Sequence, residues 1–155
     1  MPALDALNDD SEAMMREMPK YATALLPALL ALESLAALAL GWGMYQRLAP
    51  GRIGPRLGPL TEFRFNDQLV WGLAVGATLS LLPAFEGGRN AGYNLLVFFG
   101  ALYLIRGIGV LAWMSRGRYV YVVILGLIPQ VFLIVTLALG LGDTWLDIRR
   151  RVGPA

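Results

Sequence analysis

Four long apolar stretches, separated by short polar segments, set the pattern of the chain. They cover residues 21–45, 67–83, 91–114 and 119–141, and the second is the shortest. An α-helix needs about 20 predominantly apolar residues to cross the hydrocarbon core of a bilayer. The pattern therefore predicts an all-α fold: a polytopic membrane protein with four transmembrane helices.

Residues 1–20 precede the first apolar stretch and are rich in charged side chains. Asp9 and Glu12 have the spacing of a capping box at the start of a helix. Three methionines behind them fall on one helix face, with most charges on the other. We expect an amphipathic leader helix at the membrane surface, although a solvated leader fits the same residues. The methionines are Met14, Met15 and Met18.

Residues 142–155 form a polar, basic tail. Gly142 is expected to end the fourth span, and Asp143 to cap a short interfacial helix. Trp145 would face the lipid boundary. Asp147 and Arg151 have the i,i+4 spacing of a helical ion pair.

The longest connector, residues 46–66, is rich in proline and glycine, which exclude a regular helix. The connector also carries several arginines, but it lacks the GK[ST] sequence and the following helix of a P-loop. A nucleotide site is therefore not expected. Contact with anionic lipid head groups is the preferred interpretation for these arginines and for those of the tail. The residues assigned to this role are Arg52, Arg56, Arg149, Arg150 and Arg151.

Small residues inside the spans predict close helix packing. Pro27 is expected to bend the first span and Pro129 to interrupt the fourth. Asn90 and Asn94 could cap the third span or bond across helices, and capping is the preferred interpretation. The residues predicted to let neighbouring helices approach are Gly72, Gly76, Ser80, Gly100 and Gly107.

Composition narrows the chemistry. The chain is 57% hydrophobic and 15% charged, and it has no cysteine and no histidine. Disulfides, thiol nucleophiles, Cys/His zinc sites and histidine-ligated haem are therefore excluded. A net charge of +2 gives no argument for nucleic acid. We expect no metal, no cofactor and no enzymatic activity.

Glu33 and Arg106 are the two charges well inside spans. Each would cost about 2.5–3.5 kcal/mol at the centre of a lipid-exposed helix, so neither is expected to face lipid. Both lie near mid-depth, where Arg106 could offer a bidentate fork to Glu33. Tyr103, one turn before Arg106, and Gln130, at similar depth on the fourth span, could join them.

Three interpretations of this polar pair remain open. It could form a pocket for a small ligand or a proton-coupled site, or a buried ion pair that fixes the register of the bundle. Arg106 could also meet a carboxylate of a partner subunit.

The third span and the tail resemble a known family. YNLLVFFGALYLIRGIGVLAWMSRGR from Tyr93 and GLGDTWLDIRRR from Gly140 are similar to the C-terminal half of the YybS-like, DUF2232 family of bacterial integral membrane proteins. That family is distantly similar to the substrate-binding S components of energy-coupling-factor transporters. The resemblance therefore implies a small-molecule site among the helices. The matched residues are Asn94, Leu102, Tyr103, Gly107, Gly142, Asp143, Trp145, Asp147 and Arg149.

Two functions are consistent with these features. The first is a non-enzymatic subunit of the bacterial inner membrane, in contact with lipids and with other membrane subunits of a larger complex. The second is a small-molecule transport component with a polar site near Glu33 and Arg106. The Lys and Arg residues divide equally between the two sides of four spans, so the positive-inside rule leaves the orientation open.

Overall fold

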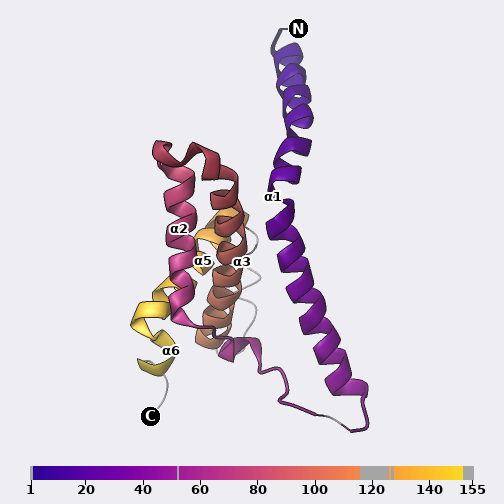
Figure 1. The fold of residues 1–155 in the computed structure, drawn as a ribbon, viewed down its shortest axis with the longest axis vertical. Coiled ribbons are helices and arrows are strands. Elements are labelled where there is room, and N and C mark those ends of the chain that lie inside the picture. The colour runs from indigo at the N-terminus through magenta and orange to yellow at the C-terminus, as the bar shows by residue number, and fades with distance from the viewer. Residues whose placement is uncertain (1, 52, 116–125, 127, 152–155) are drawn as a thin grey trace.

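The regular secondary structure of the described residues is entirely helical, and an irregular connector joins α1 to the other helices (Figure 1). The computed structural model describes residues 2–51, 53–115, 126 and 128–151, and none of these lies in a strand. The all-α prediction is confirmed for them. The elements in order are α1 (Pro2–Leu48), the 3-10 turns η1 (Leu60–Glu62) and η2 (Asp67–Leu69), α2 (Val70–Leu81), the 3-10 turn η3 (Pro83–Gly88), α3 (Arg89–Met114), α5 (Pro129–Leu146) and α6 (Ile148–Arg151).

Three segments of the described chain are long and apolar enough to cross a membrane: Ala22–Leu48, Pro83–Met114 and Pro129–Leu146. The predicted count of four is not confirmed. The second predicted span, 67–83, contains α2, which has 12 residues. A helix of that length is about 18 Å long, against about 30 Å for the hydrocarbon core. Most of the first part of the fourth predicted span, 119–125 and 127, lies outside the described residues.

Helix α1 joins the predicted leader and the predicted first span into one element of 47 residues. At 1.5 Å per residue it is about 70 Å long, more than twice the hydrocarbon thickness. It contains Pro19 and Pro27, and Figure 1 shows the helix changing direction in this stretch. Proline bends a helix because it removes one backbone hydrogen bond and its ring crowds the preceding turn.

Helices α2 and α3 form an antiparallel hairpin through η3. A Cβ added at Gly76 would lie 3.1 Å from the Gly92 carbonyl oxygen and 3.0 Å from Leu95 Cβ, so the two backbones approach closely there. A Cβ at Gly72 would overlap the ring of Phe99, and one at Gly92 would overlap Ser80. The small residues of α2 therefore set its distance from α3.

Helices α3 and α5 pack even more tightly. A Cβ at Gly107 would overlap the carbonyl of Thr136, and one at Gly140 would overlap the carbonyl of Tyr103. Gly100, which was predicted to serve the same purpose, would meet no atom of the described chain within 4 Å. It is therefore no contact point within this part of the chain. The side chains that are fully buried at this crossing are Tyr103, Arg106, Val110, Thr136 and Asp143.

The end of α5 differs from the prediction. The helix continues through Gly142 and Asp143 to Leu146 and stops at Asp147, whose φ of 46° is left-handed. The predicted helix stop at Gly142 was wrong, because this glycine stays helical. Asp143 caps no new helix, since its carboxylate points into the α3 contact. A short helix does follow, as α6.

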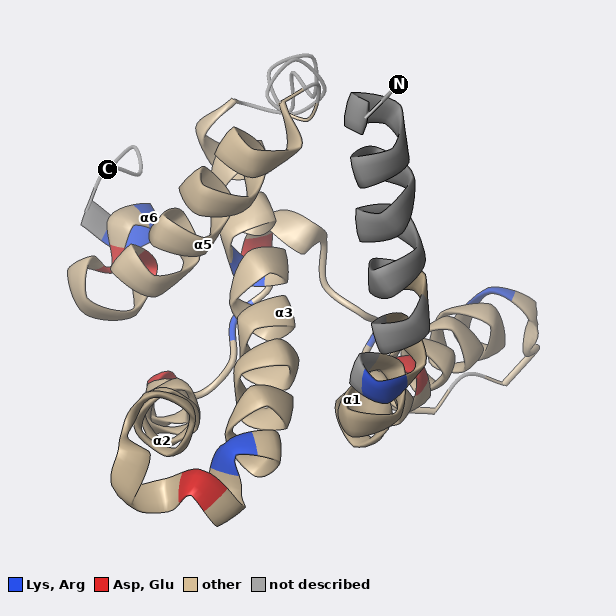
Figure 2. Ribbon diagram, turned by 90° about the horizontal axis from the view of Figure 1, so that it is seen from above, with Lys and Arg blue, Asp and Glu red and all other residues tan. Residues whose placement is uncertain are grey.

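Charged residues are sparse along α2, α3 and the candidate span of α1. Figure 2 shows long uncharged lengths of α2 and α3, with charges gathered at the α2–α3 turn and around α6. One group of charges, however, lies deep between α3, α5 and the connector that precedes α2.

Candidate functional site: a buried arginine–carboxylate cluster

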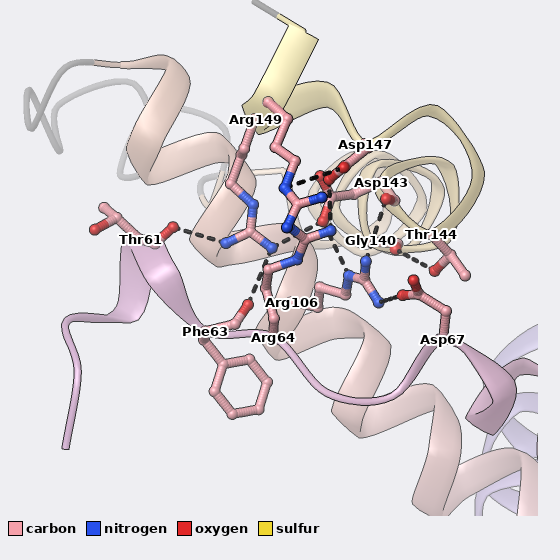
Figure 3. A network of polar contacts seen from close by, with 11 residues as sticks. Thr61, Phe63, Arg64, Asp67, Arg106, Gly140, Asp143, Thr144, Asp147 and Arg149 are labelled. Carbon is pink, nitrogen blue, oxygen red and sulfur yellow. Dashed lines mark hydrogen bonds and ion pairs between the residues drawn. The ribbon is translucent and has the colours of Figure 1, made fainter. Parts of the chain in front are cut away.

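Arg106 is the centre of this group. It projects from α3, and no part of it is exposed in the described chain. Its Nε donates to Asp143 Oδ2 at 3.0 Å, its Nη1 to Asp67 Oδ1 at 2.7 Å, and its Nη2 to the Asp143 carbonyl oxygen at 3.2 Å. All three guanidinium nitrogens therefore have acceptors, two of them on α5 and one at the start of η2 (Figure 3).

Asp143 holds a second arginine. Arg149, from α6, donates through Nη2 to the same Asp143 Oδ2 at 2.8 Å. It also donates to the carbonyl oxygens of Thr61 at 2.7 Å and Phe63 at 3.0 Å. One fully buried carboxylate thus joins α3, α5 and α6, and Arg149 ties the connector to them. We call Arg106, Asp67, Asp143 and Arg149 the Arg106 cluster.

Helix lengths explain how two acids reach Arg106. Asp67 comes just before α2, and Asp143 is in the last turn of α5. Because α2 has 12 residues and α3 has 26, α2 begins part-way along α3. Helix α5 also ends beside α3. The cluster therefore forms where two helix ends and a polar connector meet the C-terminal half of the longer helix α3.

An outer pair of contacts closes the edge of the cluster. The left-handed Asp147 that ends α5 accepts from Arg64 Nη2 at 2.5 Å, and Arg150 Nε lies 3.5 Å from its other oxygen. The side chain of Arg150 is 78% exposed, so its contact with Asp147 contributes little. Arg64 adds a second link between the connector and the end of α5.

Aromatic rings form one wall of the cluster. The guanidinium carbon of Arg106 lies 5.3 Å from the centroid of the Phe65 ring, a cation–π distance. The Phe65 ring meets Tyr103 edge-on, with centroids 5.0 Å apart. The connector therefore supplies an apolar cover to Arg106 as well as carbonyl acceptors to Arg149.

Three buried polar atoms of this region have no hydrogen-bond partner among the described residues: the Tyr103 hydroxyl, Asp143 Oδ1 and Arg149 Nε. A groove of about 720 Å³ opens next to the cluster and is mainly apolar. Asp67, whose side chain is 52% exposed, links the two. The groove lies between α2, α3 and α5, and its lining includes Trp71, Leu137, Thr144 and Trp145.

The charges of the Arg106 cluster balance, with two arginines against two aspartates. Among the described residues no three acidic side chains lie together in a way that could hold a metal ion. Arg106 and Arg149 are both bonded to acceptors of this chain. The cluster therefore resembles a structural contact that holds the helices together more than an open charged binding site. The prediction that Arg106 is buried and ion-paired agrees with this geometry.

The predicted partner of Arg106 was wrong. Glu33 lies on an exposed part of α1, and among the described residues no hydrogen bond or ion pair reaches it. Gln130 is exposed in the first turn of α5. Of the four residues predicted for the polar site, only Tyr103 and Arg106 come together. Asp67 and Asp143 were missed because each was assigned to a helix end, although a buried arginine requires an acid.

Asn94 does not cap α3, which was the preferred interpretation, but takes the alternative role and bonds across to α1. Its side-chain oxygen accepts from the Ala28 amide at 2.8 Å, and its nitrogen donates to the Ala24 carbonyl at 2.7 Å. These two backbone groups are i→i−4 partners in a regular helix. They lie beside Pro27, so the Asn94 amide satisfies backbone groups at the point where proline disturbs α1.

The arginines assigned to lipid head groups fall into different environments. Arg149 is 8% exposed and committed to the Arg106 cluster, so the assignment was wrong for it. Arg56 and Arg150 are exposed. Arg52, and the side chain of Arg151, lie outside the described part of the chain.

One comparison with known proteins gave a match. A family model described as "Predicted membrane protein (DUF2232)" matches residues 4–144. The match covers α1 and α2 in addition to the third span, and it ends before Trp145, Asp147 and Arg149. No curated protein and no solved structure matched the chain.

Proposed function

We propose a function for this chain from the premise that it belongs to the DUF2232 family of predicted membrane proteins. It is a non-enzymatic integral membrane subunit that acts through helix–helix contacts within a larger membrane complex. The observation that carries this proposal is the exposed carboxylate of Glu33 on a helix that the rest of the chain leaves almost uncovered.

The uncovered helix is α1. Only 6% of the most apolar window in its candidate span is buried in the chain. It contacts α3 around Ala24 and Ala28, and near its end Trp42 and Gln46 bond to carbonyls of the connector. Between these two attachments its side chains face outward. Lipid can cover leucine and alanine there, but it covers a carboxylate poorly.

The charge on Glu33 supplies the energetic argument. An ionised group at the centre of a lipid-exposed helix costs about 2.5–3.5 kcal/mol on the insertion scale. Arg106, the other charge away from the helix ends, avoids this cost through acceptors within the chain. Glu33 has no such acceptor or donor in the described chain, so a group from outside is the natural source of compensation.

The contacts of the Arg106 cluster support a structural role for Arg106. Arg106 and Arg149 are both bonded to acceptors on α5 and the connector, and both are buried. We assign the chain to the bacterial cytoplasmic membrane as part of the same proposal, with exposed Arg56 and Arg150 as lipid-contacting residues.

Extraction from native membranes tests the subunit proposal. The full chain, tagged at one end, is released in a mild detergent or a membrane-solubilising polymer and its native mass is measured. We expect a complex in which at least one other membrane protein is stoichiometric with the chain and brings the chain down in the reciprocal purification. A particle with only this chain and lipid, at every extraction condition, would contradict the proposal.

A second candidate function rests on the groove beside Asp67. Its volume of about 720 Å³ is within the usual range for small-molecule pockets, and a polar cluster lies at one end of it. This favours a transport component that binds a small, mainly apolar molecule between α2 and α5. Retention of a metabolite through purification, lost in Trp71→Ala and retained in Trp42→Ala, would favour transport over the subunit role.

A further inference from the structure

We propose that the outer face of α1 docks one transmembrane helix of a partner protein, and that this helix carries an arginine or lysine opposite Glu33. The inference rests on the proposed subunit function and names the surface and the chemistry of the partner. Three features of α1 support it: the spacing of its exposed residues, the place of Glu33 among them, and the direction in which they face.

The exposed residues on this face repeat with the period of a coiled coil. Successive members are separated by four, three, four, three and four residues, which is the a/d spacing of a heptad. All six are exposed in the chain, so no other described element covers them. This spacing suits a neighbouring helix that crosses at about 20°. We call this row the α1 seam; its members are Ala22, Leu26, Leu29, Glu33, Ala36 and Leu40.

Glu33 occupies one position of the α1 seam, with apolar residues on both sides of it. A single polar residue at such a position fixes the register between two helices, because any shift leaves it without its partner. Ala36, one turn further on, leaves room for a long side chain to approach the carboxylate. The α1 seam therefore provides both an apolar contact and one specific polar contact.

The α1 seam faces away from α3. Ala28 is buried against α3, and the Asn94 bonds to Ala24 and Ala28 fix the side of α1 that α3 covers. Glu33 follows Ala28 by five residues, which is a rotation of about 140° around the helix at 3.6 residues per turn. A helix docked on the α1 seam would thus meet no obstruction from α3.

Charge decides the kind of partner. A second copy of this chain would bring Glu33 against another Glu33. The basic side chain in the described region that lies away from the ends of the candidate spans is Arg106, and its three nitrogens are already bonded. The described part of a second copy therefore offers no complementary group away from the ends of its candidate spans. An arginine in another protein's helix supplies a two-pronged donor, and a lysine supplies a point charge.

The depth of Glu33 further defines the partner. It lies near the middle of Ala22–Leu48, the candidate span of α1. Because a charge near mid-membrane must be matched at the same depth, the basic residue is expected near the centre of its own transmembrane helix. An arginine or lysine at the end of a helix would reach the head groups instead.

Photo-crosslinking in native membranes tests the proposal on the full chain. A photoreactive amino acid is placed at Leu29 or Ala36, on the α1 seam, and at Leu38, which is 70% exposed on the opposite side of α1. We expect crosslinks from the two seam positions to one protein, in a segment with a central arginine or lysine, and much weaker ones from Leu38. Glu33→Gln should lower the seam yield by roughly fivefold or more, whereas Glu86→Gln, in the exposed η3 turn, should not.

Charge exchange then identifies the contact. Glu33→Lys should abolish the crosslink, and replacing the partner's basic residue with glutamate should restore it in that background. Crosslinks from the α1 seam only to lipid, only to a second copy, or equally from Leu38 would overturn the inference. If a stoichiometric partner still co-purifies in that case, the proposed function stands and only the docking surface is wrong. If no partner co-purifies, both are wrong.

Discussion

Replacing Asn94 tests how α1 is held against the bundle. Asn94→Ala removes two hydrogen bonds between α3 and α1. They are the bond from the Ala28 amide at 2.8 Å and the bond to the Ala24 carbonyl at 2.7 Å. Interhelical hydrogen bonds in membrane proteins contribute about 0.6 kcal/mol each on average and up to about 1.7. Two of them give a loss of roughly 1–3 kcal/mol in the free energy of unfolding.

The loss should depend on Pro27. Without proline, α1 could run straight through this turn and pair Ala28 with Ala24 itself, as in any regular helix. Asn94 would then have little to compensate. We therefore expect Asn94→Ala to cost less in a Pro27→Ala background than in the native chain, with a coupling of at least about 0.5 kcal/mol between the two sites.

Two measurements check this prediction. Unfolding by a denaturing detergent in mixed micelles gives the free energies of unfolding of the native chain, the two single variants and the double variant of Asn94 and Pro27. Because the chain has no cysteine, spin labels can be attached to cysteines introduced at the exposed positions Leu38 and Leu81, and their separation reports how α1 lies against the hairpin. Asn90→Ala is the matched control, since Asn90 is exposed one turn earlier on α3. An unchanged unfolding free energy and label distance in Asn94→Ala would refute the reasoning.

Three further substitutions probe the rest of the bundle. Asp143→Asn should destabilise by about 3–5 kcal/mol, because it removes the buried negative charge that Arg106 and Arg149 share. Asp67→Asn should cost less, because the side chain of Asp67 is half-exposed. Equal losses in detergent unfolding would contradict this description of the Arg106 cluster. Gly107→Val should prevent close α3–α5 packing and lower the yield of folded protein, whereas Gly100→Val should be tolerated, as size-exclusion chromatography would show. Arg149→Lys keeps the charge but loses the planar guanidinium that bonds to the Thr61 and Phe63 carbonyls. The connector should then be held less firmly, and proteolysis within residues 60–66 should accelerate. An unchanged cleavage rate would argue against the role of Arg149 in holding the connector.

The membrane class and the helical fold were predictable from the sequence, because runs of apolar residues at span length have few other uses. The small residues of α2 were also informative, since Gly72 and Gly76 lie where a larger side chain would meet α3. Element boundaries were less predictable. Gly142 is compatible with a helix stop and with a helix interior, and only the contact of α5 with α3 decides between them.

The polar partners could not be derived from depth along each span. The sequence placed Glu33 and Arg106 near mid-depth of the predicted spans 21–45 and 91–114, which suggested a pair. Helix α3, however, extends past the start of α2 and the end of α5. Asp67 and Asp143, which lie at those two helix ends, therefore bond to Arg106 in place of Glu33. Asn94 shows the same limit. A polar residue in the first turns of a helix suggests a cap, whereas Asn94 bonds to Ala28, next to a proline and 66 residues away in the sequence.

A double-mutant cycle between Arg106 and each candidate acid tests most directly how the in-span charges are neutralised. Single and double variants of Arg106→Gln with Asp143→Asn, and of Arg106→Gln with Glu33→Gln, are compared by detergent unfolding of the isolated chain. We predict a coupling of at least about 1.5 kcal/mol between Arg106 and Asp143, and one within about 0.5 kcal/mol of zero between Arg106 and Glu33. A large coupling of Arg106 to Glu33, with none to Asp143, would contradict the account.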